Sequence, residues 1–90
     1  MKKSISVDLL EVLKQDKIIQ VKLGFAYMSQ IKFVPYINAL IDSINIQTNL
    51  KPEKSIIPDT HIRSLIVKAN TKYIQKLIED RLVVVGVLYK

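Results

Sequence analysis

The spacing of apolar residues changes several times along the chain and predicts a succession of elements. Over residues 7–15 apolar side chains recur at helical spacing, which predicts a helix. Ser6 stands immediately before it and is a residue type that caps helices. The same segment also allows an alternating strand over residues 5–9, so the pattern leaves two interpretations.

A strict alternation of apolar and other residues follows at residues 17–27 and predicts a half-buried strand. Its apolar positions are Ile19, Val21, Leu23, Phe25 and Tyr27. Gly24 lies inside this run, which indicates a bulge or the close approach of another backbone.

Helical spacing returns after this strand. Pro35 is expected at the first helical position, where its missing N–H costs no hydrogen bond. Residues 48–55 are the least apolar stretch and include Pro52, so we expect a flexible loop there.

Residues 61–80 allow two interpretations. In the first, one long helix carries an apolar stripe at Ile62, Ile66, Ala69, Tyr73 and Leu77. In the second, a turn at residues 68–71 separates two helices, and Asn70 caps the second of them near Thr71. The periodicity barely distinguishes them, and the capping residues favour two helices.

The last segment, residues 82–89, is apolar at successive positions, as expected of a strand inside a sheet or an oligomer interface. Residues 11–27 and 76–89 share a pattern: a helix end, an acidic–basic pair, then a strand containing a glycine. We therefore expect the two strands, at about 17–27 and 82–89, to pair. The prediction is one α+β domain over residues 1–90, with about four helices, two strands and a helix-turn-helix as one interpretation of residues 60–80.

The residue types needed for most enzyme chemistry are scarce. The 90 residues include no cysteine, so disulfides and thiolate sites are excluded, and His61 is the only histidine. Gly24 and Gly86 are isolated, so no glycine-rich phosphate loop exists. We expect a non-enzymatic protein without a metal site or cofactor.

The charge distribution points to an anionic partner. The net charge is +6, and the only charged residues of segment 63–76 are one arginine and three lysines. Basic side chains can neutralise phosphates, while amide side chains can reach base edges. The candidate nucleic-acid-binding residues are Arg63, Lys68, Asn70, Thr71, Lys72, Gln75 and Lys76.

Residues 63–82, RSLIVKANTKYIQKLIEDRL, resemble the helix-turn-helix of excisionase-type DNA-binding regulators. The shared features are an apolar helix, a short turn, a polar cap at Asn70 and the ending at residues 77–82. The resemblance implies a recognition helix whose major-groove side chains are Thr71, Lys72, Gln75 and Lys76. Lys68 replaces the turn glycine of that pattern, and the glycine that follows its recognition helix is missing here.

The expected function is therefore that of a small basic nucleic-acid-binding or regulatory domain. The alternative is a protein-interaction or oligomerisation module, because the apolar segments exceed what 90 residues readily cover. The expected partners are nucleic acid or an acidic protein, with a homodimer as the assembly. Neither a signal peptide nor a membrane span is predicted, so we expect a cytoplasmic protein.

Overall fold

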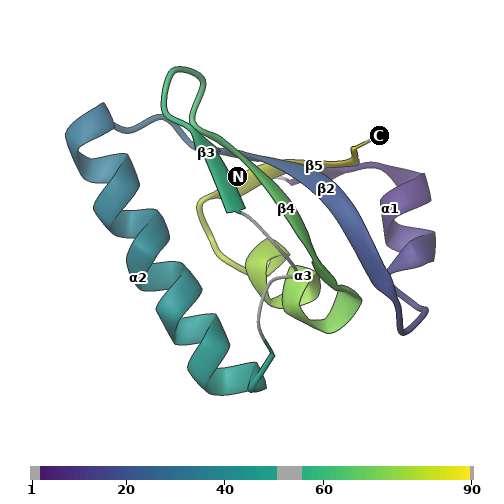
Figure 1. Ribbon diagram of the computed structural model, residues 1–90. Coiled ribbons are helices and arrows are strands. Elements are labelled where there is room, and N and C mark those ends of the chain that lie inside the picture. Colours follow the sequence, from purple (N-terminus) through teal and green to yellow (C-terminus); the bar gives the residue numbers. More distant parts are fainter. Residues whose placement is uncertain (1–2, 51–55, 90) are drawn as a thin grey trace.

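Five strands form one mixed sheet in residues 3–50 and 56–89, the part of the chain that the computed structural model describes (Figure 1). The strands are β1 (Ser4–Ile5), β2 (Ile18–Phe25), β3 (Ile56–Asp59), β4 (Ser64–Asn70) and β5 (Val83–Leu88). Their order across the sheet is β1-β5-β2-β4-β3. β1 pairs with β5 in parallel, and the other neighbouring pairs are antiparallel.

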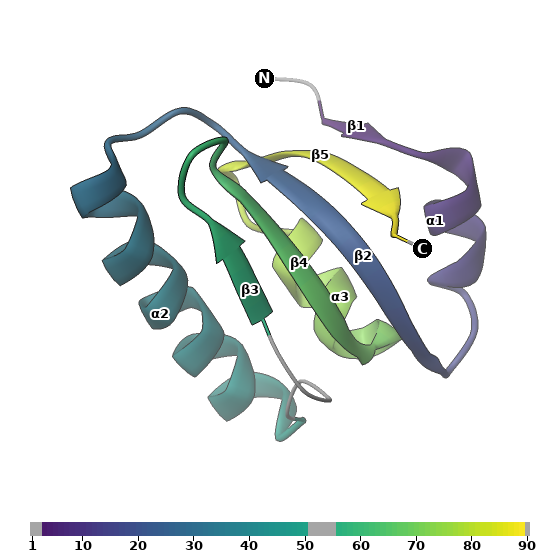
Figure 2. The same ribbon diagram turned by 45° about the horizontal axis from the view of Figure 1, so that its top comes forward.

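The described residues include three helices, α1 (Val7–Val12), α2 (Gln30–Thr48) and α3 (Thr71–Ile78). In Figure 2 the strands pass in front of α3. α1 lies on the same side of the sheet, because Leu9 packs over the core-facing side of Gly86, beside Leu23. The helices therefore gather on one side of the sheet.

The order of elements from β2 to β5 is βαββαβ. With the strand order β5-β2-β4-β3, it gives the split βαβ, or ferredoxin-like, arrangement. β1 and α1 extend this unit at its β5 edge. The sequence prediction that residues 17–27 and 82–89 form paired strands is confirmed, since Val21 lies opposite Leu88 and Leu23 opposite Gly86.

Alternation of side chains along β2 and β4 builds the core. Leu23 on β2 and Leu65 and Val67 on β4 are fully buried, and the aromatic ring of Phe25 meets Phe33 of α2 edge-on at 5.7 Å. The pairing register between β2 and β5 shifts between Gly24 and Phe25, which agrees with the first of the two alternatives predicted for Gly24, a bulge.

The expectation of about four helices and two strands is wrong. The described chain has three helices and five strands, and residues 64–70, predicted as helix, form strand β4. The apolar residues of this segment fit the spacing of three and four that is typical of a helix, but Leu65, Val67 and Ala69 also alternate as in a strand. The side chains of these three residues are buried. Strand geometry prevails because β4 pairs along β2 over seven residue positions.

The helix-turn-helix at residues 60–80 is therefore also wrong. Lys68 lies inside a strand, and the element before α3 is β4 rather than a helix. One part of that interpretation is confirmed: Asn70 caps a helix that begins at Thr71.

Pro35 does not open the second helix. α2 begins at Gln30, and Pro35 lies inside it, in the second turn. The helix starts earlier because burial of Phe33 extends the apolar stripe toward the N-terminus. Ser6 does cap α1, accepting a hydrogen bond from the backbone N–H of Leu9. Of the predicted loop at 48–55, residues 51–55 lie outside the described residues.

Candidate functional site

Two of the predicted binding residues are used for folding. Thr71 is buried, and its hydroxyl donates a 2.6 Å hydrogen bond to the carbonyl of Gln15. The side chain of Asn70 accepts from the backbone N–H of Lys72 at 2.8 Å and donates to Asp16 at 2.9 Å. Both residues thus fasten the β4–α3 junction to the turn between α1 and β2.

Arg63 lies at the other end of β4, away from the α3 lysines. Its guanidinium stands 5.5 Å from the centroid of the Tyr27 ring and donates a hydrogen bond to the carbonyl of Met28. Its backbone has a positive φ of 53°, and its carbonyl accepts from the N–H of Phe25. Arg63 therefore holds the β2–α2 connection against the β3–β4 turn.

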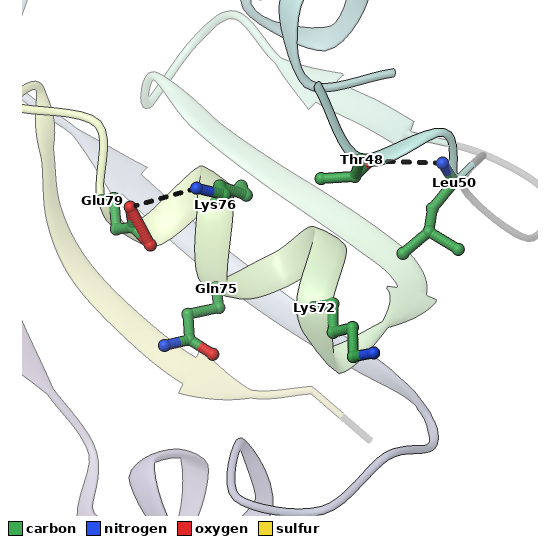
Figure 3. A pocket seen from close by; sticks show the side chains of 6 residues that line it. All are labelled: Thr48, Leu50, Lys72, Gln75, Lys76 and Glu79. Atoms are coloured by element: carbon green, nitrogen blue, oxygen red, sulfur yellow. Dashed lines mark hydrogen bonds and ion pairs between the residues drawn. The ribbon is translucent and has the colours of Figure 1, made fainter. Parts of the chain in front are cut away.

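Lys72, Gln75 and Lys76 are exposed on α3, so the structure brings these three predicted residues together. With Glu79 they form one wall of a hollow of about 350 Å³, and Thr48 and Leu50 form the other (Figure 3). Lys76 and Glu79 approach to 3.8 Å. An exposed ion pair of this kind contributes little stability.

The hollow beside α3 differs from a small-molecule site. Such sites bury most of a ligand and place a few polar groups within an apolar lining. Here the α3 side chains are exposed to solvent, and Thr48 is occupied by its hydrogen bonds to the carbonyl of Ile44 and the N–H of Leu50. The arrangement is a surface groove suited to contact with an extended partner.

Lys68 points to the opposite side of the sheet, where it joins residues that the sequence analysis did not select. We call this surface the open face, and none of the helices of the described residues covers it. It comprises Ile18, Gln20, Lys22, Gly24, Ile66, Lys68, Val85, Val87 and Tyr89. Tyr89 follows β5 and continues its alternation, with its N–H bonded to the carbonyl of Gln20.

Exposed β-branched residues distinguish the open face. Ile18 is 50% exposed, Val85 42% and Val87 37%, and Tyr89 beside them is 40% exposed. The solvent side of an antiparallel sheet is normally polar. Apolar side chains gathered on an exposed surface mark interaction sites in soluble proteins. The open face is therefore the strongest candidate site in the described part of the chain.

Two lysines give the open face its charge. Lys22 lies opposite Val87 on one side and Ile66 on the other, and Lys68 lies opposite Gln20. Asp59 also lies on this side of the sheet, opposite Ser64 at the end of the edge strand β3, and its carboxylate is four positions along β4 from Lys68 in that register. Neither lysine makes an ion pair with a described residue. The face thus offers two ammonium groups in an apolar setting.

The sequence contained one usable signal for this face. Gln20, Lys22 and Gly24 alternate with the buried residues of β2, so their shared orientation follows from the strand prediction. The contribution of β4 was hidden because residues 64–70 were predicted as helix. Without β4 as a neighbour, Lys22 and Lys68 could not be placed on one surface.

Two phenols, the buried Tyr73 and the half-buried Tyr36, lie apart from the open face. Burial raises the pKa of Tyr36 to about 12, and the hydrogen bond to Asp80 adds to the shift. Burial also raises the pKa of Tyr73 to about 12, assisted by the negative charge of Asp42. In residues 3–50 and 56–89 no three histidine or carboxylate side chains are placed to share a metal ion.

No protein-family model matches this chain, and neither the curated proteins nor the solved structures searched provide a match. Among the described residues, no helix has the length and apolar character needed to cross a membrane. The surfaces described above are therefore the basis for inferring a function.

Proposed function

We propose that this protein is a non-enzymatic binding module whose open face recognises an acidic surface of another protein. The observation that carries the proposal is the combination of exposed Val85 and Val87 with Lys22 and Lys68 on an uncovered sheet. Burial of the apolar side chains supplies binding energy, at roughly 25 cal/mol per Å² before the costs of association. The lysines select a partner that carries carboxylates.

Nucleic acid is the second candidate partner, supported by the exposed Lys72, Gln75 and Lys76 on α3. The open face suits it less well. Sheets that bind single strands stack bases on aromatic side chains, which contribute roughly 1–3 kcal/mol per base. β2 and β4 place no aromatic residue on the open face, where Tyr89 at the end of β5 is the single aromatic. We therefore favour a protein partner.

A homodimer formed by the open face is disfavoured by charge. In a two-fold interface each copy presents the same patch to the other. Lys22 and Lys68 of one protomer would then share a buried interface with the same lysines of its partner. Like charges placed together in this way oppose association. A different protein with carboxylates meets no such cost.

Two charge-reversed variants test the proposal. Lys22→Glu/Lys68→Glu alters the open face, and Lys72→Glu/Lys76→Glu makes the same change in net charge on α3. Tagged wild-type protein and both variants would be used to isolate partners from cells of the source organism, and the partner would then be purified and titrated. We expect the α3 variant to bind like wild type and the open-face variant to lose roughly tenfold in affinity or more.

Binding of random single- and double-stranded DNA and RNA across a salt series provides the opposing test. Affinity that falls steeply with salt and is lost in Lys72→Glu/Lys76→Glu would replace our proposal with nucleic-acid binding through α3. Equal protein binding by wild type and the open-face variant would also contradict it. Circular dichroism of both variants establishes that they are folded.

A further inference from the structure

We infer that the partner covers the open face with a single amphipathic helix carrying two carboxylates one helical turn apart. The inference rests on the proposed function, because it specifies what the open face binds. It follows from the width of the apolar strip, from its length and from the position of its two lysines.

The width of the strip corresponds to one helix. The apolar residues of the open face lie on β5, β2 and β4, which are adjacent in the sheet; Ile66 on β4 is half-buried and the others are exposed. Neighbouring strands are about 4.8 Å apart, so three strands span about 10 Å between the outer two. An α-helix with its side chains is about 10 Å across. One helix laid on the sheet covers this strip.

The length of the strip gives the extent of that helix. The strip runs from Val85, opposite Gly24, past Tyr89, opposite Gln20, to Ile18 at the start of β2. This is an advance of six residues along β2, or about 20 Å at the rise of a strand. That distance is nearly four turns of helix. The occupant is therefore a short helix with apolar residues at positions i, i+3, i+4 and i+7.

The layering of the domain favours a helix over a second sheet. A sheet with two apolar sides reaches a stable arrangement when both sides are covered, and mixed α and β domains cover them with helices. Here the helices cover one side only, and β-branched residues on the other side remain exposed. A partner helix would complete a three-layer arrangement.

The lysines define the polar part of the recognition. Lys22 lies opposite Ile66, so Lys68, two residues further along β4, is its diagonal neighbour. Diagonal positions on adjacent antiparallel strands are about 7–8 Å apart. Side chains at i and i+4 of a helix are about 6 Å apart, and flexible lysine stems span the difference. Glutamates or aspartates at these helix positions can pair with both lysines.

Selection from an unbiased display library of random 20-residue peptides tests the inference with wild-type protein as bait. We expect the enriched sequences to carry the helical apolar pattern with acidic residues at i and i+4. Synthetic copies should gain helical circular dichroism on binding. Their affinity should fall roughly tenfold for Lys22→Glu/Lys68→Glu and stay unchanged for Lys72→Glu/Lys76→Glu. Replacing the two acids by lysine in the peptide should restore binding to the open-face variant.

The outcomes separate the inference from the proposed function. Enriched peptides that alternate with a period of two, bind without helical signal and still depend on Lys22 and Lys68 would overturn the helix but keep the open face as a protein-binding site. Enriched peptides that bind wild type and the open-face variant equally would overturn both. A selection that enriches no sequence would overturn the inference of a helix.

Discussion

The phenol of Tyr36 on α2 donates a 2.6 Å hydrogen bond to the Oδ2 atom of Asp80, which lies between α3 and β5. The same carboxylate oxygen accepts from the backbone N–H of Leu82 at 3.1 Å. One carboxylate thus joins the long helix to the turn that leads into β5. Its contribution to stability is open to direct measurement.

Tyr36→Phe removes the phenolic donor while leaving the ring in place. Hydrogen bonds to charged groups contribute about 1.5–3 kcal/mol, and the lower end applies because this pair is only partly buried. We expect the free energy of unfolding in urea to fall by about 1.5 kcal/mol. Tyr27→Phe is the control, since Tyr27 is exposed. Equal stability of the two variants would show that the hydrogen bond contributes nothing net.

Alkaline pH should weaken the fold through the phenols of Tyr36 and Tyr73. Burial raises the pKa of Tyr36 and of Tyr73 to about 12, against 10 for an ordinary tyrosine. Above pH 10 the unfolded chain releases these protons before the folded protein does, so the free energy of unfolding decreases as pH rises. The stabilisation is complete below pH 10 and is lost between about 10 and 12.

Urea denaturation at a series of pH values from 9 to about 12 measures this slope. The double variant Tyr36→Phe/Tyr73→Phe should show a shallower fall than wild type, because neither phenol is left to titrate. A wild-type stability that stays constant through this range would contradict the prediction.

Gly86 and Gly24 form a matched pair for a test of packing. A Cβ atom at Gly86 would meet Cδ1 of Ile5 at 3.0 Å and Cδ2 of Leu23 at 3.2 Å, whereas one at Gly24 would meet Cβ of Val85 at an ordinary 3.4 Å. Overpacking of a core costs about 1–3 kcal/mol. We expect Gly86→Ala to be less stable than Gly24→Ala by about 1 kcal/mol in urea denaturation, and equal stabilities would refute it.

Substitutions of Asn70 test how much the N-terminal cap of α3 contributes to stability. Asn70→Ala removes the acceptor of the Lys72 N–H and the hydrogen bond to Asp16, so the free energy of unfolding should fall by about 1–2 kcal/mol. Asn70→Ser keeps a capping oxygen and should recover most of the loss. Thermal unfolding followed by circular dichroism measures both variants, and similar losses in alanine and serine variants would argue against the cap.

Several elements could be predicted from the sequence because their patterns admit one dominant interpretation. The alternation through Val21 and Leu23 and the apolar run at residues 82–89 are strand signals, and both segments are strands. Ser6 and Asn70 were predicted as caps from residue type, and both side chains accept the expected backbone hydrogen bonds. Capping and alternation are local properties, so they can be predicted before the neighbours of a segment are known.

The candidate site was harder to predict from the sequence than these elements. Lys72, Gln75 and Lys76 were expected on one helix and do lie together on α3, whereas Lys68 lies on the far side of the sheet. Lys68 was wrongly placed on a helix because its segment fits two patterns. Leu65, Val67 and Ala69 alternate as in a strand, whereas Ile66, Ala69 and Tyr73 have the spacing of a helix.

The sequence by itself determined an α+β chain with a net positive charge and two strands that pair, and it favoured a cap at Asn70. Only the tertiary structure decided that residues 64–70 are a strand, because their conformation depends on backbone hydrogen bonds to β2, whose paired residues are 40 to 52 positions away in the chain. That pairing in turn placed Lys68 beside Lys22 and created the open face. Pairing between distant segments is fixed by which side chains can be buried together, and one segment's pattern cannot reveal its partner.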